Sequence, residues 1–167
     1  MNLLSMLFLL ALGGVAQAVL PPVPLLARAH VPVLAALVVY YALTRSPGFA
    51  LGTAVLAGIV HDSLGLVPLG YSSFCFGVAV LLIHRFRADI FAWEGATHVV
   101  VGAAVAGGTT LGLSMLLRVT GQVELSLAQA GFKTLGSVLL GALVTPIVAR
   151  GVTALDATLG LAREDSR

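Results

Sequence analysis

Asp62 is the residue of this chain best suited to chemistry, because it is the one carboxylate within a long apolar segment. An ionisable group inside a membrane segment is a functional candidate by default, for instance as a proton or cation relay. His61 precedes it and His84 ends the next apolar segment. Neighbouring side chains point about 100° apart on a helix, so we do not expect His61 and Asp62 to share a face.

A structural interpretation of Asp62 competes with the relay. Asp62 begins the turn-like sequence Asp62-Ser63-Leu64-Gly65, and carboxylates at such turns commonly accept hydrogen bonds from nearby backbone N–H groups. A relay would need further polar partners. The apolar segment 96–117 offers few of them: Thr97, His98, Thr109, Thr110 and Ser114. We therefore favour a structural brace over a relay.

The remaining sequence offers no recognisable catalytic or cofactor site. It contains no Ser-His-Asp set, phosphate-binding loop or metal-ligand spacing, and we expect no cofactor and no metal. The single cysteine, Cys75, excludes an internal disulfide. The basic residues form no cluster, which argues against nucleic acid as a partner.

Composition points to an integral membrane protein. Hydrophobic residues make up 59% of the 167 residues and charged residues 10%, and no charged residue occurs in the segment 1–27. A helix needs about 20 apolar residues to cross a bilayer. The chain has room for several such runs, and we predict an all-α, polytopic bundle that passes through the lipid bilayer repeatedly.

Six transmembrane helices give the best account of the apolar runs. The predicted spans are 3–20, 26–43, 48–65, 70–84, 96–117 and 128–149, within a single domain of residues 1–150. Pro21, Pro22 and Pro24 end the first span, because proline lacks a backbone donor and clashes with the preceding turn. The second span is the weakest, and five spans result if it does not cross.

Two shorter segments have the pattern of interfacial helices. Phe86, Ile90 and Trp93 lie at spacings that share one helix face, within the charged stretch 85–94. The segment 151–167 alternates apolar and charged residues in a similar way, and we predict a short amphipathic cytoplasmic tail there.

The basic residues predict that both termini are cytoplasmic. With six spans, the side that carries the termini holds six basic residues and the other side holds three, and the cytoplasmic side of a membrane protein is usually the richer. The sequence Ala16-Gln17-Ala18 resembles a signal-peptidase site. No basic residue precedes the apolar stretch, so we expect the first helix to be retained.

Small residues indicate where helices approach closely, since lipid provides no hydrophobic force between them. Gly48 and Gly52 are four residues apart in the third span. Gly107, Gly108 and Gly112 lie in the fifth span, and the last two share the same spacing. These faces either pack within the monomer, or one of them, that of the fifth span, receives a helix from another protein.

The segment 40–87 resembles the rod shape-determining protein MreD family of bacteria. The similarity lies in residues 41–48 (YALTRSPG), in Gly52, and in residues 57–70 (AGIVHDSLGLVPLG). The end of the last span, residues 139–146 (LLGALVTP), is also similar. Four residues of this motif are the candidate structural or functional residues within the membrane: Gly58, Asp62, Pro68 and Gly70.

The resemblance implies a non-enzymatic scaffold of the cell-wall elongation machinery in the bacterial inner membrane. Such proteins bind the single-span protein MreC and associate with RodA and its partner transpeptidase in the peptidoglycan-synthesis complex. The implied fold is similar to the substrate-binding components of energy-coupling-factor transporters. The alternative is therefore a small-molecule (vitamin) binding subunit of a transporter, for which Ser72, Ser73, Gln122 and Glu124 are the available polar groups.

Overall fold

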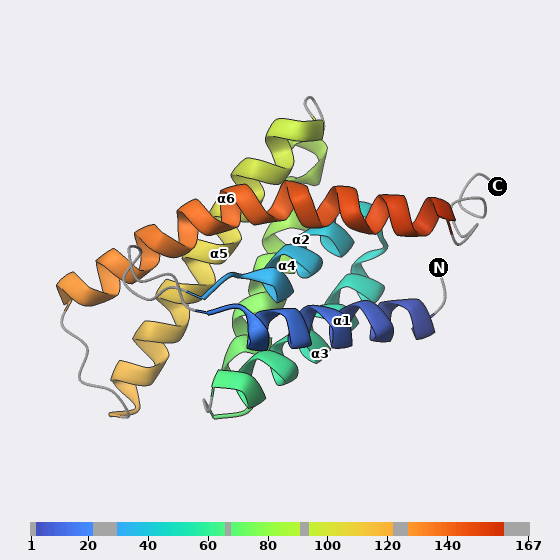
Figure 1. The fold of residues 1–167 in the computed structure, drawn as a ribbon. Coiled ribbons are helices and arrows are strands. Elements are labelled where there is room, and N and C mark those ends of the chain that lie inside the picture. Colours follow the sequence, from blue (N-terminus) through green and yellow to red (C-terminus); the bar gives the residue numbers. More distant parts are fainter. Residues whose placement is uncertain (1–2, 22–29, 66–67, 91–93, 122–126, 159–167) are drawn as a thin grey trace.

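The structure is a computed structural model and describes residues 3–21, 30–65, 68–90, 94–121 and 127–158. This part of the chain forms helices and contains no strand, which confirms the predicted all-α fold (Figure 1). The helices are α1 (Leu3–Val19), α2 (Val33–Thr44), α3 (Pro47–Gly65), α4 (Tyr71–Ile90), α5 (Glu94–Val119) and α6 (Leu127–Thr158).

Helix α2 is the centre of the bundle and contacts each of the other helices. Every residue from Leu34 to Leu43 is buried, on all faces of the helix. A helix that is apolar all round is stable only when other elements surround it. The ring of Tyr41, which is fully buried, lies 5.8 Å from that of Phe49 on α3.

Successive helices run in alternating directions. In Figure 1 the ends of α1, α3 and α5 lie toward the lower left, and the ends of α2, α4 and α6 lie toward the upper right. The beginning of α1 and the end of α6 therefore lie toward the same end of the bundle.

Three helices are long and apolar enough to cross a membrane: α3, the Ala96–Val119 part of α5, and the Ala128–Leu155 part of α6. The outward surface of α6 carries large apolar side chains such as Phe132, Leu143 and Ile147. A surface of this kind is unfavourable in water and suits lipid. These features indicate a membrane protein.

The other three apolar helices are shorter: Leu3–Val19, Val33–Thr44 and Tyr71–Phe86. At 1.5 Å per residue, the 12 residues of α2 measure about 18 Å. This is well short of the bilayer core, which is about 30 Å thick.

Helix α2 begins later than predicted, at Val33 instead of residue 26. Residues 22–29 lie outside the described ranges. The described residues His30 and Val31 are not helical, because proline at position 32 disfavours helical backbone in the residue before it.

Helices α4 and α6 continue past their predicted ends. We expected α4 to stop at residue 84 before a separate interfacial helix, but it runs to Ile90, since no glycine or proline interrupts residues 84–90. We also expected a separate tail from residue 151 onward. Helix α6 instead continues through Arg150 to Thr158 without a break, so the first part of the predicted tail belongs to α6. Phe86 is exposed. The Ile90 side chain, Trp93 and the end of the tail lie outside the described part.

Candidate functional site

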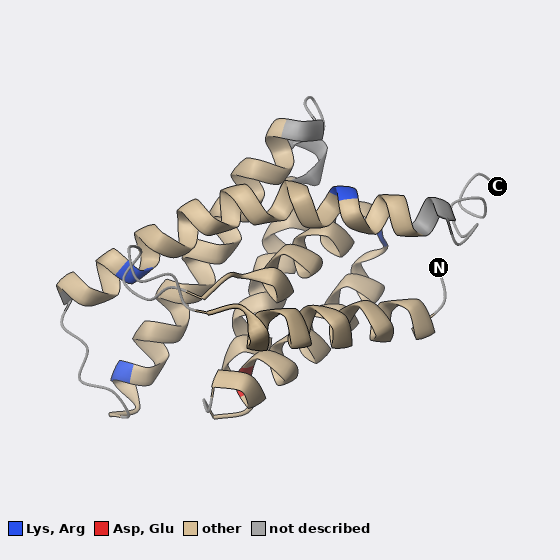
Figure 2. Ribbon diagram, viewed as in Figure 1, with Lys and Arg blue, Asp and Glu red and all other residues tan. Residues whose placement is uncertain are grey.

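Asp62 lies fully buried near the end of α3, where the chain turns toward α4. It is the only acidic residue whose side chain the structure describes, and Figure 2 shows it apart from the scattered basic residues. A buried carboxylate without compensation is strongly unfavourable. Its partners therefore decide its role.

The partners of Asp62 are backbone donors at the start of α4. Its Oδ2 accepts a hydrogen bond from the Gly70 N–H at 2.8 Å, and Oδ1 accepts one from the Ser72 N–H at 3.1 Å. The first N–H groups of a helix lack partners within it, and the helix dipole favours a negative charge there. Asp62 on α3 thus caps α4. The turn into α4 uses the positive φ of Gly70, 104°, which glycine adopts without strain.

His61 also contacts the start of α4, through the side chain of Ser72. Its Nδ1 lies 2.9 Å from the Ser72 hydroxyl, and its ring meets that of Phe76 edge-on at 5.9 Å. His61 and Asp62 contact different atoms of Ser72, its hydroxyl and its N–H, as two neighbouring side chains that do not share a helix face can do. Both oxygens of Asp62 are engaged by backbone N–H groups, an arrangement that favours bracing over proton transfer.

Gly58 allows α4 to lie directly against α3. A Cβ at Gly58 would overlap the backbone N and Cα of Ser73. The Ser73 hydroxyl donates to the Val55 carbonyl at 3.0 Å across the same contact. Ser72 and Ser73, which we considered for a vitamin pocket, thus hold α4 to α3. Pro68 is half-buried in the turn between them. Gln122 and Glu124 lie outside the described ranges.

The glycines chosen from the sequence divide into packed and open positions. A Cβ at Gly107 would meet Val138 of α6, and one at Gly112 would lie 3.1 Å from the Cys75 sulfur of α4. Positions Gly48, Gly52 and Gly108 have open space where a Cβ would be. Those three therefore do not mediate contacts between the described helices.

A tight contact of α5 with α6 uses Gly102 and Gly141, which lie outside the four-residue spacings of Gly48 with Gly52 and of Gly108 with Gly112. A Cβ at Gly102 would overlap the Thr145 side chain, and one at Gly141 would lie 2.6 Å from the Gly102 carbonyl oxygen. Both residues are buried. Glycine content alone marked these helices as closely packed, but it did not indicate which face of each helix makes the contact.

An apolar groove of about 420 Å³ lies between α4 and α5. Large side chains form one part of its lining, among them Phe74, Leu82 and Phe86 of α4 and Val100 of α5. Small residues of α5 form another part: Ala104, Gly108 and Gly112. The one hydroxyl in the lining, that of Thr109, donates within its own helix to the Val105 carbonyl.

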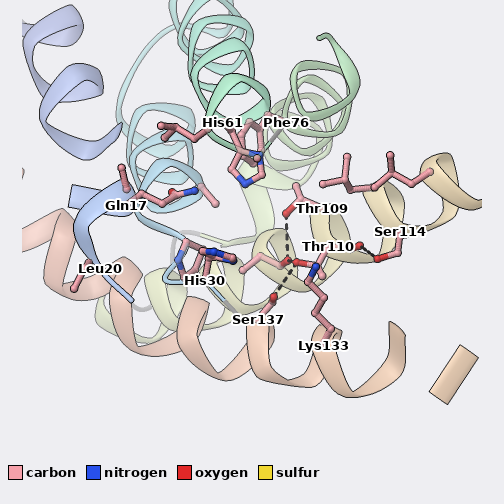
Figure 3. A pocket seen from close by; sticks show the side chains of 18 of the residues that line it. Gln17, Leu20, His30, His61, Phe76, Thr109, Thr110, Ser114, Lys133 and Ser137 are labelled. Atoms are coloured by element: carbon pink, nitrogen blue, oxygen red, sulfur yellow. Dashed lines mark hydrogen bonds between the residues drawn. The ribbon is translucent and has the colours of Figure 1, made fainter. Parts of the chain in front are cut away.

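A second cavity, of about 430 Å³, lies at the end of the bundle where α1, α3 and α5 finish and α2, α4 and α6 begin. Its polar lining includes Gln17, His30, His61 and Lys133 together with hydroxyl groups of α5 and α6 (Figure 3). Sequence reasoning missed this site. Polar residues within apolar runs were the available signals, but their spacing does not indicate that they share a cavity: Gln17, His61, Thr109, Thr110, Ser114 and Lys133.

No group of three His, Cys, Asp or Glu side chains that could hold a metal ion occurs within the described ranges. No protein-family model, curated protein or solved structure gives a significant match to the chain.

Proposed function

We propose that this protein is a non-catalytic membrane scaffold of the bacterial cell-wall elongation machinery. It binds an MreC-like single-span protein and, through it, the complex of RodA with its partner transpeptidase. The resemblance of residues 40–87 to the MreD family supports the identity of the machinery. The α4–α5 groove is the observation that carries the scaffold role.

The groove has the properties of a site for a transmembrane helix. Where large residues flank a row of small ones, a second helix can approach closely enough for van der Waals packing, which drives helix association in lipid. Gly108 is exposed, with no atom within 4 Å of where its Cβ would be. The exposed surface around Gly108 is therefore a place where a partner helix can dock on the fifth predicted span.

The alternating helix directions support six spans with both termini on one side of the membrane (Figure 1). The basic-residue bias makes that side cytoplasmic. The chain then lies in the bacterial inner membrane, with the groove facing lipid along α4 and α5.

Replacing Gly108 with leucine tests the groove. The new side chain would occupy the space into which a partner helix packs, so we expect co-purification of the single-span partner from native membranes to fall severalfold or more. Gly131→Leu is a matched control, because Gly131 is also exposed with open space around it but lies on α6 outside the groove. It should leave co-purification unchanged.

Equal partner recovery with Gly108→Leu and the unsubstituted protein would exclude the groove as the docking face. Both variants should accumulate to normal levels, since both positions are exposed and a Cβ at either has no atom within 4 Å in the described structure.

The second cavity favours one alternative, a vitamin-binding subunit of a transporter. Its volume falls in the range of small-molecule sites, about 300–1,000 Å³. Purification in mild detergent separates the two functions. An ATPase module and a bound vitamin would be recovered for a transporter subunit, and a single-span protein for the scaffold.

A further inference from the structure

The cavity at the end of the bundle gathers polar groups that are rare elsewhere in the described helices. Lys133 enters it from α6, His61 from the end of α3, and His30 from the segment before α2 (Figure 3). His61 is within electrostatic range of Asp62 and, more weakly, of His30 and Lys133. Lys133, His61 and His30 are cationic or can become so, and the cavity lining contains no carboxylate.

Lys133 lacks an anionic partner within the described chain. The one acidic side chain described, Asp62, directs both oxygens to backbone donors of α4. A lysine ammonium within an apolar helix is unfavourable unless it is paired or reaches water. Lys133 is half-buried and lies in the apolar part of α6. The electrostatics of the cavity therefore favour an anion.

Hydroxyl groups beside Lys133 form the rest of the polar surface. Ser137 lies one helical turn beyond Lys133, so the two side chains share a face of α6. The Ser137 hydroxyl is 2.9 Å from that of Thr110 on α5, and Ser114 donates to the Thr110 carbonyl. An ammonium group beside hydroxyl groups is a common arrangement for binding phosphate or carboxylate oxygens.

The other part of the cavity is apolar. Leu20 of the chain after α1, Phe76 of α4, and Leu113 and Leu117 of α5 line it. A small hydrophilic anion would leave this surface without contacts. A ligand that carries an anionic group at one end and an apolar portion at the other would match both parts.

We propose that this cavity binds an amphiphile through an anionic phosphate or carboxylate group, with Lys133 as its counter-ion. The ligand is a membrane lipid with an anionic headgroup, which enters between the helices. The site requires no partner protein, so it stands independently of the scaffold role.

Thermal unfolding of the purified chain in a neutral detergent tests the site. The probes are dihexanoyl-phosphatidylglycerol, dihexanoyl-phosphatidylcholine and inorganic phosphate, each titrated separately. A ligand that binds only the folded state raises the unfolding midpoint, by an amount that grows with the logarithm of its concentration above the dissociation constant. We expect phosphatidylglycerol to raise the midpoint and phosphatidylcholine, which has no net charge, to have little effect.

Lys133→Gln removes the charge while keeping a side chain of similar length. It should weaken the apparent affinity for phosphatidylglycerol by about tenfold or more, the effect of losing a charge-assisted hydrogen bond. Arg118→Gln is the matched control, because Arg118 is exposed near the same end of α5 and does not line the cavity. Lys133→Arg, which retains the charge, should keep a response.

Each outcome is decisive. A midpoint shift with phosphatidylglycerol that Lys133→Gln abolishes supports the site. An equal shift with inorganic phosphate, which has no apolar portion, would show that the apolar lining contributes nothing to binding and would overturn the amphiphile. No shift with any anion, or the same shift in Lys133→Gln, overturns the proposal. If Lys133→Gln does not fold, Ser137→Ala should still weaken the response, and an unchanged response there also overturns it.

Discussion

Asp62 caps a helix other than its own, and this explains how a carboxylate can be fully buried in an apolar bundle. Its oxygens satisfy the N–H groups of Gly70 and Ser72, which would otherwise lack partners at the start of α4. The helix dipole compensates the charge. If Asp62 is a structural brace, its substitution should lower the free energy of unfolding of the protein.

We expect Asp62→Asn to lower the free energy of unfolding by about 1–3 kcal/mol, because the amide keeps one acceptor but turns a donor toward backbone N–H groups. Accumulation in the membrane and the unfolding midpoint in detergent measure this. Ser63→Ala is the control, since the Ser63 hydroxyl is exposed and donates only within α3. Normal stability of Asp62→Asn, with loss of a pH-dependent activity alone, would restore the relay interpretation.

Sequence reasoning found Asp62 but could not find its partners. The carboxylate stands out because it is the only one in an apolar run, whereas its donors lie 8 and 10 residues further along, beyond a turn. Gln17 was missed for a related reason. Its Oε1 accepts the Leu34 N–H at 3.2 Å, 17 residues away, and so caps α2 from α1. Hydropathy patterns do not record contacts across a loop.

At the scale of helices, the junction of α3 with α4 depends on the absence of a side chain at Gly58. We expect Gly58→Ala to lower the free energy of unfolding by about 1–3 kcal/mol, because the added methyl group would overlap the Ser73 backbone, which cannot move without displacing α4. The unfolding midpoint in detergent measures the change.

Gly52→Ala is the control on the same helix. Gly52 has no atom within 4 Å of where its Cβ would be, so the substitution should be neutral or slightly stabilising through helix propensity. Equal midpoints for the two variants would show that α4 does not lie against α3 as described.

The six apolar helices were predictable from apolar runs and prolines, but the two shorter interfacial helices expected after residues 84 and 150 are continuations of α4 and α6. The faces on which the helices contact one another were not predictable. Gly48 with Gly52, and Gly108 with Gly112, have the spacing of a packing motif, yet Gly48, Gly52 and Gly108 lie open while Gly102 and Gly141 form the tight α5–α6 crossing. Apolar residues surround these helices on all sides, so the sequence does not mark an inner face. Rotation about each helix axis is set by the neighbouring helices.

For the molecule as a whole, the short α2 is compatible with a bundle that crosses the bilayer. A helix exposed to lipid must span the hydrocarbon region, because its backbone groups would otherwise be unsatisfied there. The protein itself surrounds α2, and Gln17 satisfies one of its first N–H groups. Its length therefore need not match the bilayer, which is why counting apolar residues left five and six spans both open.

Accessibility of single cysteines separates the two topologies. In a Cys75→Ser background, Leu4→Cys, Ser46→Cys and Thr120→Cys place exposed thiols at the start of α1, between α2 and α3, and after α5. If α2 crosses and the termini are cytoplasmic, a membrane-impermeant maleimide added to intact spheroplasts should label only the thiol at position 120. The other two should react only after permeabilisation. Labelling of positions 4 and 46 from opposite faces would mean that α2 does not cross. The chain would then have five spans and its termini on opposite sides of the membrane.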